Sequence, residues 1–122
     1  MSARLVRLAL ASLVLVLVFA PDARAHAILV SSQPAANAEL AGPDVDVRLE
    51  FNSRIDAARS TLQLAKDGGA LAPLPLAEAK EPNLLAAKAA GLAPGAYRLR
   101  WQVLSVDGHV SRGDVTFKVR AP

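Results

Sequence analysis

The residues that could carry chemistry in this sequence are two histidines and one aspartate. The chain has two histidines, His26 and His109, and no cysteine. His109 follows Asp107 by two positions, with Gly108 between them. If the backbone there is extended, the Asp107 and His109 side chains point to the same face. This spacing predicts a metal site, although Asp-Gly is also a common hairpin turn in which His109 has no functional role.

The first 25 residues have the features of a secretory signal. Two arginines precede an uncharged apolar run over 8–20, and Ala-Arg-Ala over 23–25 supplies the small residues of a cleavage site. The run is short for a membrane-spanning helix, although an uncleaved anchor is the alternative. We expect cleavage after Ala25, export of the mature protein and a single domain over 26–122. His26 would then begin the mature chain, where its free amine and its imidazole Nδ1 together chelate one metal ion.

The set of donor atoms favours copper. Amine and imidazole nitrogens with a carboxylate oxygen suit a tetragonal site, which binds Cu(II) in preference to Zn(II). The only methionine is Met1, which cleavage removes, so the mature chain has neither the thiolate nor the thioether that holds Cu(I). We therefore predict one Cu(II) ion bound by His26, Asp107 and His109.

Removing the signal also changes the charge of the chain. It takes away three arginines and one aspartate, which leaves 11 basic and 10 acidic residues among the 97 of the mature chain, a net charge of +1. This balance offers no basic patch for nucleic acid. Because cysteine is absent, packing alone must hold the exported domain together.

Apolar and polar residues alternate through most of the mature chain, which predicts strands. The clearest strands cover 45–51 and 96–103, and further strands are expected at 28–30, 61–66, 83–89 and 114–120. Residues 38–44 are consistent with a helical turn or a loop, and residues 68–82 with a connection that crosses between sheets. Six or seven short strands in one small domain predict an all-β antiparallel sandwich or Greek-key barrel.

The sequence also suggests places for three aromatic residues and three serines. Tyr97, Trp101 and Phe117 lie at inward-facing positions, so we expect them in the core. Three serines near the predicted ligands could support a metal site by hydrogen bonding, but we interpret them as surface or turn residues: Ser31, Ser32 and Ser105.

The mature chain resembles the CopC family of periplasmic copper-binding proteins. Its start, HAILVSSQPAANAEL, is similar to the mature start of that family. Residues 94–119 match the family pattern G-x-Y-x-x-x-W-x-x-x-S-x-D-G-H-x-x-x-G-x-x-x-F-x-V at Gly95, Tyr97, Trp101, Ser105, Asp107, Gly108, His109, Gly113, Phe117 and Val119. The resemblance implies a seven-stranded cupredoxin-like or immunoglobulin-like β-barrel. It also implies a Cu(II) site made by His26, Asp107 and His109.

The chain departs from the family at two places. Some members hold Cu(I) in a methionine-rich loop, whereas this chain has no methionine after Met1. Many members have Phe-Ser-Glu or Phe-Thr-Glu after the second strand, where this chain has Phe51-Asn52-Ser53. That glutamate is therefore missing as a further ligand.

These features predict an exported copper-binding protein, not an enzyme, that serves copper tolerance, buffering or delivery to a separate inner-membrane copper transporter. We expect it to be a monomer. A terminal histidine with a second histidine is also the minimal histidine brace of copper oxygenases, but the small size and the carboxylate ligand argue against that alternative. The other alternative is a β-sandwich that binds a protein partner without a metal.

Overall fold

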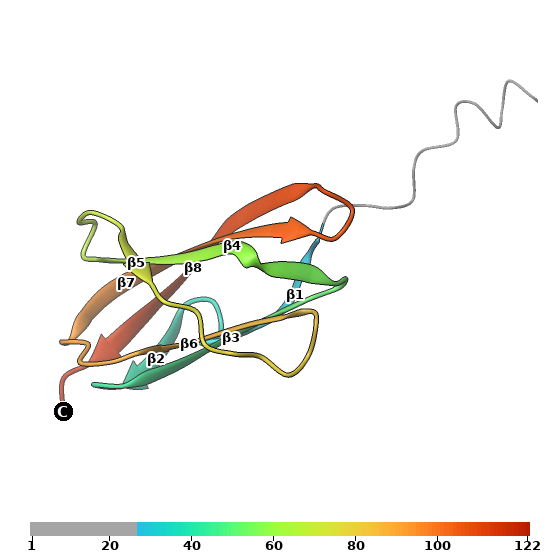
Figure 1. The fold of residues 1–122 in the computed structure, drawn as a ribbon. Helices are drawn as coiled ribbons and strands as arrows, with labels where there is room; N and C mark the ends of the chain where they lie inside the picture. Colours follow the sequence, from blue (N-terminus) through green and yellow to red (C-terminus); the bar gives the residue numbers. More distant parts are fainter. Residues whose placement is uncertain (1–26) are drawn as a thin grey trace, which may run out of the picture.

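The computed structural model describes residues 27–122, so the predicted signal and His26 lie outside the described residues. The described part folds into eight strands (Figure 1). They are β1 (Leu29–Gln33), β2 (Ala38–Ala41), β3 (Val45–Phe51), β4 (Ile55–Lys66), β5 (Ala72–Leu74), β6 (Leu84–Ala89), β7 (Gly95–Ser105) and β8 (Val110–Arg120). Within residues 27–122, no helix is long and apolar enough to cross a membrane.

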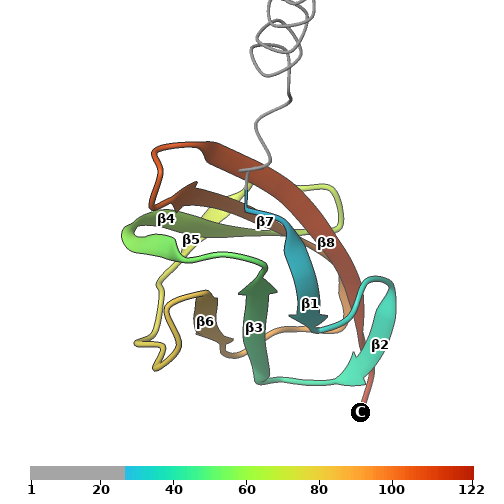
Figure 2. The same cartoon turned by 90° about the vertical axis from the view of Figure 1, so that its right-hand side faces the viewer.

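The strands form two sheets that pack against each other (Figure 2). The smaller sheet has the order β1-β3-β6, and the larger sheet has the order β2-β8-β7-β4-β5. All neighbouring strands are antiparallel except β2, which runs parallel to β8. The all-β sandwich predicted from the alternating pattern is confirmed, with one strand more than the resemblance implies.

The core lies between the two sheets and is built by the predicted alternation. In β3 every second residue is buried, from Val45 to Phe51. In β7 and β8 the buried residues face them, and Tyr97 stacks on Phe117 with ring centroids 5.4 Å apart. Phe51 meets Trp101 edge-to-face at 5.2 Å and so joins the two sheets. Each such side chain contributes about 1.5–3 kcal/mol on burial, so these contacts substitute for the missing disulfides.

Two of the expected elements differ in the structure. Residues 38–41, expected as a helical turn or loop, form strand β2, because Ala38–Ala41 pair in register with Phe117–Arg120. The strand expected at 61–66 begins earlier, at Ile55, and its pairing with β7 is interrupted between Asp56 and Thr61. In both cases the neighbouring strand supplies hydrogen-bond partners that a local pattern does not reveal.

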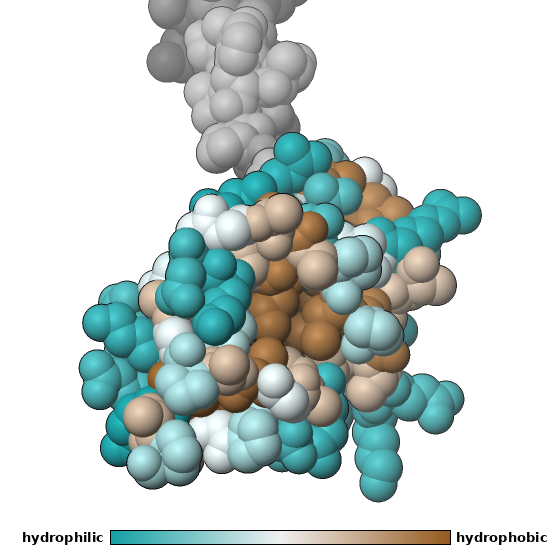
Figure 3. Space-filling model, turned by 90° about the vertical axis from the view of Figure 1, so that its left-hand side faces the viewer, coloured by the Kyte–Doolittle hydropathy of each residue, from teal (hydrophilic) through white to brown (hydrophobic). Residues whose placement is uncertain are grey.

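The predicted connection over 68–82 does cross between the sheets. Its strand β5 pairs with β4 of the larger sheet, and Ala77 then forms an isolated bridge to Ala86 of β6 in the smaller sheet. Figure 3 views the end of the molecule that carries the C-terminus, where polar side chains surround an apolar hollow. The tip of the β7–β8 hairpin, with the predicted ligands, lies at the opposite end (Figure 1).

Candidate metal centre

Asp107 and His109 lie in the short turn that joins β7 to β8. The turn is closed by backbone hydrogen bonds from Ser105 N–H to the His109 carbonyl oxygen (2.8 Å) and from Gly108 N–H to the Ser105 carbonyl oxygen (2.9 Å). Gly108 has a φ of 92°, a conformation that residues with a Cβ rarely adopt. The Asp-Gly pair therefore does form a hairpin turn, and that turn holds Asp107 and His109 together.

The two predicted donor side chains are in direct contact. His109 Nδ1 lies 3.2 Å from Asp107 Oδ1, and both side chains remain partly exposed, 53% for His109 and 37% for Asp107. Partial exposure leaves this pair accessible to an ion from solvent. The backbone here is a turn and is not extended, as the shared-face argument required, and this turn brings a nitrogen and an oxygen donor within hydrogen-bond distance.

Ser105 is hydrogen-bonded to both residues of this pair, contrary to our interpretation of it as a surface or turn serine. Ser105 is buried, and its hydroxyl donates a hydrogen bond to Asp107 Oδ1. The backbone N–H of His109 in turn donates to Ser105 Oγ at 3.3 Å. The inward register of β7 buries Ser105 at the end of the strand, so its hydroxyl must find partners within the turn. The other two serines make hydrogen bonds elsewhere, Ser31 to Glu50 and Ser32 to the Pro34 carbonyl.

These contacts keep Asp107 in its charged form. Two hydrogen bonds lower the pKa of the Asp107 carboxyl from its ordinary 3.8 to about 2. The larger effect comes from Ser105 and the next largest from His109. The carboxylate is therefore ionised throughout the neutral range. An ionised carboxylate beside an imidazole is a donor pair for a divalent cation.

The third predicted ligand, His26, lies outside the described residues, but the chain that follows it is firmly placed. Ala27 is buried in the core. The N–H of Ile28 donates to Asn52 Oδ1 at 2.8 Å, and the N–H of Asn52 donates to the Ile28 carbonyl oxygen at 2.9 Å. This two-way contact, here called the Asn52 clamp, fixes the chain within two residues of His26.

The clamp and the Asp-Gly-His turn lie at the same end of the sandwich. The residues just after Asn52 reach the turn directly, because Val106 N–H donates to the Arg54 carbonyl oxygen at 3.4 Å. Figure 1 shows the start of β1 at the same end of the sandwich as the tip of the β7–β8 hairpin, and Figure 2 shows it below the start of β8. Sequence reasoning treated Asn52 only as a departure from a family pattern and missed the clamp. The signal was present, since asparagine in a turn commonly hydrogen-bonds to nearby backbone.

Two donor groups alone are few for a metal site. Residues 27–122 contain no group of three or more His, Cys, Asp or Glu side chains that could hold a metal ion. The structure brings together Asp107 and His109 and places the residue after His26, and it leaves His26 itself as a prediction.

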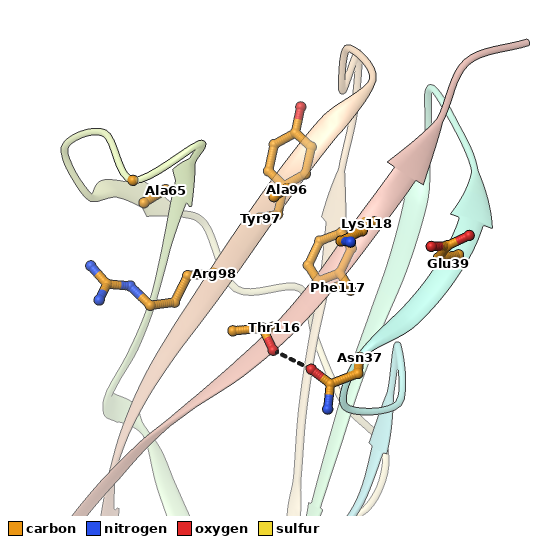
Figure 4. A pocket seen from close by; sticks show the side chains of 10 residues that line it. Asn37, Glu39, Ala65, Ala96, Tyr97, Arg98, Thr116, Phe117 and Lys118 are labelled. Carbon is orange, nitrogen blue, oxygen red and sulfur yellow. Dashed lines mark hydrogen bonds between the residues drawn. The ribbon is translucent and has the colours of Figure 1, made fainter.

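A separate groove lies on the outer face of the larger sheet (Figure 4). It has a volume of about 450 Å³, and Thr116 Oγ1 donates to Asn37 Oδ1 across one side of it. Arg98, Lys118 and Glu39 line it, and neither Asp107 nor His109 does. Among the described residues that line the groove, Glu39 is the only carboxylate and is accompanied by two cations, so the hairpin offers the better metal donors.

The fold and the donor pair define a class, an all-β sandwich with a candidate metal centre at the tip of one hairpin. Residues 29–120 match the CopC domain family. This chain therefore belongs to the CopC family, a family of copper resistance proteins, as the resemblance of its motifs indicated.

Three known proteins illustrate the relationship. Protein YobA of Escherichia coli K12 is 34% identical over 122 residues, which cover 98% of each chain. The copper transport protein CutJ of Bacillus subtilis is 31% identical over 111 residues, 88% of this chain and 20% of CutJ. The crystal structure of PcoC, a methionine-rich copper resistance protein from Escherichia coli, superposes with a TM-score of 0.68 at 28% identity, covering 79% of this chain and all of PcoC.

Proposed function

We propose that the mature protein is a periplasmic carrier that binds one Cu(II) ion through His26, Asp107 and His109. Cleavage after Ala25 supplies the free amine, which chelates the ion together with Nδ1 of His26. Asp107 and His109 complete the set with an oxygen and a nitrogen donor. The observation that carries the proposal is the Asp107–His109 contact, held by the buried Ser105 beside the start of the folded chain.

The hairpin geometry suggests how each ligand binds. Nδ1 of His109 and Oδ1 of Asp107 face each other 3.2 Å apart, so these are the two atoms that we assign to copper. Ser105 donates to the same carboxylate oxygen, and this contact would orient the Asp107 side chain toward the ion, as hydrogen-bond partners of metal ligands commonly do.

The oxidation state follows from the donors. Nitrogen and oxygen ligands favour Cu(II), and residues 27–122 contain no sulfur ligand for Cu(I). PcoC is described as methionine-rich, and this chain has no methionine after Met1. We therefore infer that it handles Cu(II) without a separate Cu(I) site.

The biological role that we propose is copper tolerance, with the protein acting as a monomer that buffers copper or delivers it to a separate membrane copper transporter. CutJ supports a link to transport, because a segment similar to this chain forms one part of that copper transport protein. We propose no catalytic role. Copper- and reductant-dependent oxidation of a polysaccharide would instead favour the histidine-brace enzyme.

The test is a competitive Cu(II) titration of the mature protein, residues 26–122, with its native amino terminus. We expect one tight equivalent of Cu(II), and a large loss of affinity for His26→Ala, His109→Ala and a chain with one extra residue before His26. Asp46→Asn serves as the control, because Asp46 is an exposed carboxylate on β3 away from the hairpin. Affinity that is unchanged by the extra residue would exclude the terminal chelate. Affinity no greater than that of a His-Ala dipeptide would favour the sandwich without a metal.

A further inference from the structure

The described part of the chain exposes four large apolar side chains, and all four lie at the end that carries the Asp-Gly-His turn. They are Ile28 (54% exposed), Val30 (57%), Val106 (68%) and Val110 (48%). Val106 and Val110 directly flank the turn, and Ile28 and Val30 lie at the start of the folded chain. Single exposed apolar residues are ordinary, but a group of them at one place marks an interaction surface. We call these four residues the apolar rim.

The two halves of the rim are held together through one turn. The Ile28 carbonyl oxygen accepts a hydrogen bond from Asn52, and the Arg54 carbonyl oxygen accepts one from Val106. Figure 1 shows the start of β1 at the same end of the sandwich as the tip of the β7–β8 hairpin, and Figure 2 shows it below the start of β8. Val106 and Val110 therefore flank the proposed ligands Asp107 and His109, and Ile28 and Val30 lie at the same end of the sandwich.

We propose that the apolar rim is the docking surface for the copper transport protein that exchanges copper with this chain. The inference rests on the proposed function and adds to it that copper passes at a protein–protein contact, without release to solvent. Apolar contacts around a partly exposed ligand pair would exclude water from the ion during transfer, and the core of an interface is commonly apolar in this way.

The small apolar area of the rim favours a partner that binds transiently over a stable dimer of this chain. Four half-exposed side chains present an apolar area on the order of a few hundred Å². A stable complex buries roughly 800 Å² on each partner, whereas transient encounters bury less. A carrier that must release its partner after each exchange needs the smaller contact.

The test is photo-crosslinking in cells of the source organism, with a photoreactive amino acid placed at Val30 or at Val106. The control position is Ala70, which is exposed in the turn between β4 and β5 at the opposite end of the molecule (Figure 1). Mass spectrometry identifies each adduct. We expect a membrane copper transport protein from both rim positions and not from Ala70. An adduct with a second copy of this chain, the same adduct from Ala70, or no adduct would overturn the proposal.

A pair of variants separates docking from copper binding. Val30→Ser combined with Val106→Ser removes apolar rim surface, and Val30→Ile combined with Val106→Ile keeps it. Because these side chains are exposed and are not ligands, we expect both variants to bind Cu(II) within about twofold of the natural protein. With the photoreactive residue at Val110, the serine variant should lose most of the adduct and the isoleucine variant should keep it. Intact copper binding with no such difference overturns the docking surface alone, whereas a natural protein without copper affinity overturns the proposed function and copper exchange with it.

Discussion

Asn52 offers the sharpest test of how the fold positions the terminal ligand. Asn52→Ala removes the acceptor of the 2.8 Å hydrogen bond from Ile28 N–H and leaves the backbone half of the clamp in place. A hydrogen bond of this kind contributes about 0.5–1.5 kcal/mol net. Without this hydrogen bond, copper binding itself would have to order the chain around Ile28. The energy of the lost hydrogen bond would then reduce the free energy of copper binding. The expected loss of Cu(II) affinity is then about 2- to 10-fold, since about 1.4 kcal/mol corresponds to tenfold.

The assay is competitive Cu(II) titration together with the electron paramagnetic resonance spectrum of the bound ion. Asn83→Ala is the matched control, because Asn83 donates from Nδ2 to the Phe51 carbonyl beside the same turn but does not touch Ile28. Asn52→Asp keeps an oxygen that accepts from Ile28 N–H and should restore the affinity. The expected spectrum of Asn52→Ala shows a mixture of ligand sets, because a less ordered terminus coordinates less uniformly. The reasoning is refuted if Asn52→Ala and Asn83→Ala weaken copper binding equally, or if Asn52→Ala lowers only the free energy of unfolding.

Two further predictions concern the core beneath the hairpin and the effect of pH. In Gly113→Ala the new Cβ would lie 2.5 Å from the Trp101 ring, so we expect a loss of about 1–3 kcal/mol in the free energy of unfolding, measured by denaturant titration, and a loss within 0.5 kcal/mol would contradict this packing. Cu(II) affinity should fall as the pH drops from 8 to 5, because protons compete with the ion for its nitrogen ligands, and a flat profile over that range would contradict ligation by the terminal amine and the histidines. Asp107 should add nothing to that slope: its pKa is depressed to about 2, so its contribution to stability is present above its ordinary 3.8 and is lost only as the pH falls from there through about 2.

The fold could be predicted closely where the pattern of a strand is local. The alternation over 45–51 coincides with β3, and Tyr97, Trp101 and Phe117 are buried as their registers indicated. Strand β2 could not be predicted in this way. Its four residues AELA carry little alternation, and they are a strand because β8 lies beside them in parallel register.

The candidate site likewise has one part that the sequence suggests and one part that only the structure shows. The Asp107–His109 pair could be proposed from its spacing, but what brings the two side chains together is the Asp-Gly turn, in which Gly108 has a φ of 92°, and not an extended backbone. The role of Ser105 could not, since its hydroxyl is directed at Asp107 only after the end of β7 is buried. The signal and His26 stay predictions from the sequence.

Residue types predict the donors for Cu(II) and the absence of soft ligands from the mature chain, and local periodicity already indicates the two-sheet β architecture. Only the packed structure shows that Asn52 clamps Ile28, 24 residues earlier, beside the Asp-Gly-His turn. It also shows that four exposed apolar side chains from two distant segments lie at the end of the sandwich that carries that turn. The physical reason is that side-chain alternation has a period of two residues, so neighbouring positions in the sequence reveal it. Which distant segments meet is decided by how the two sheets pair and pack.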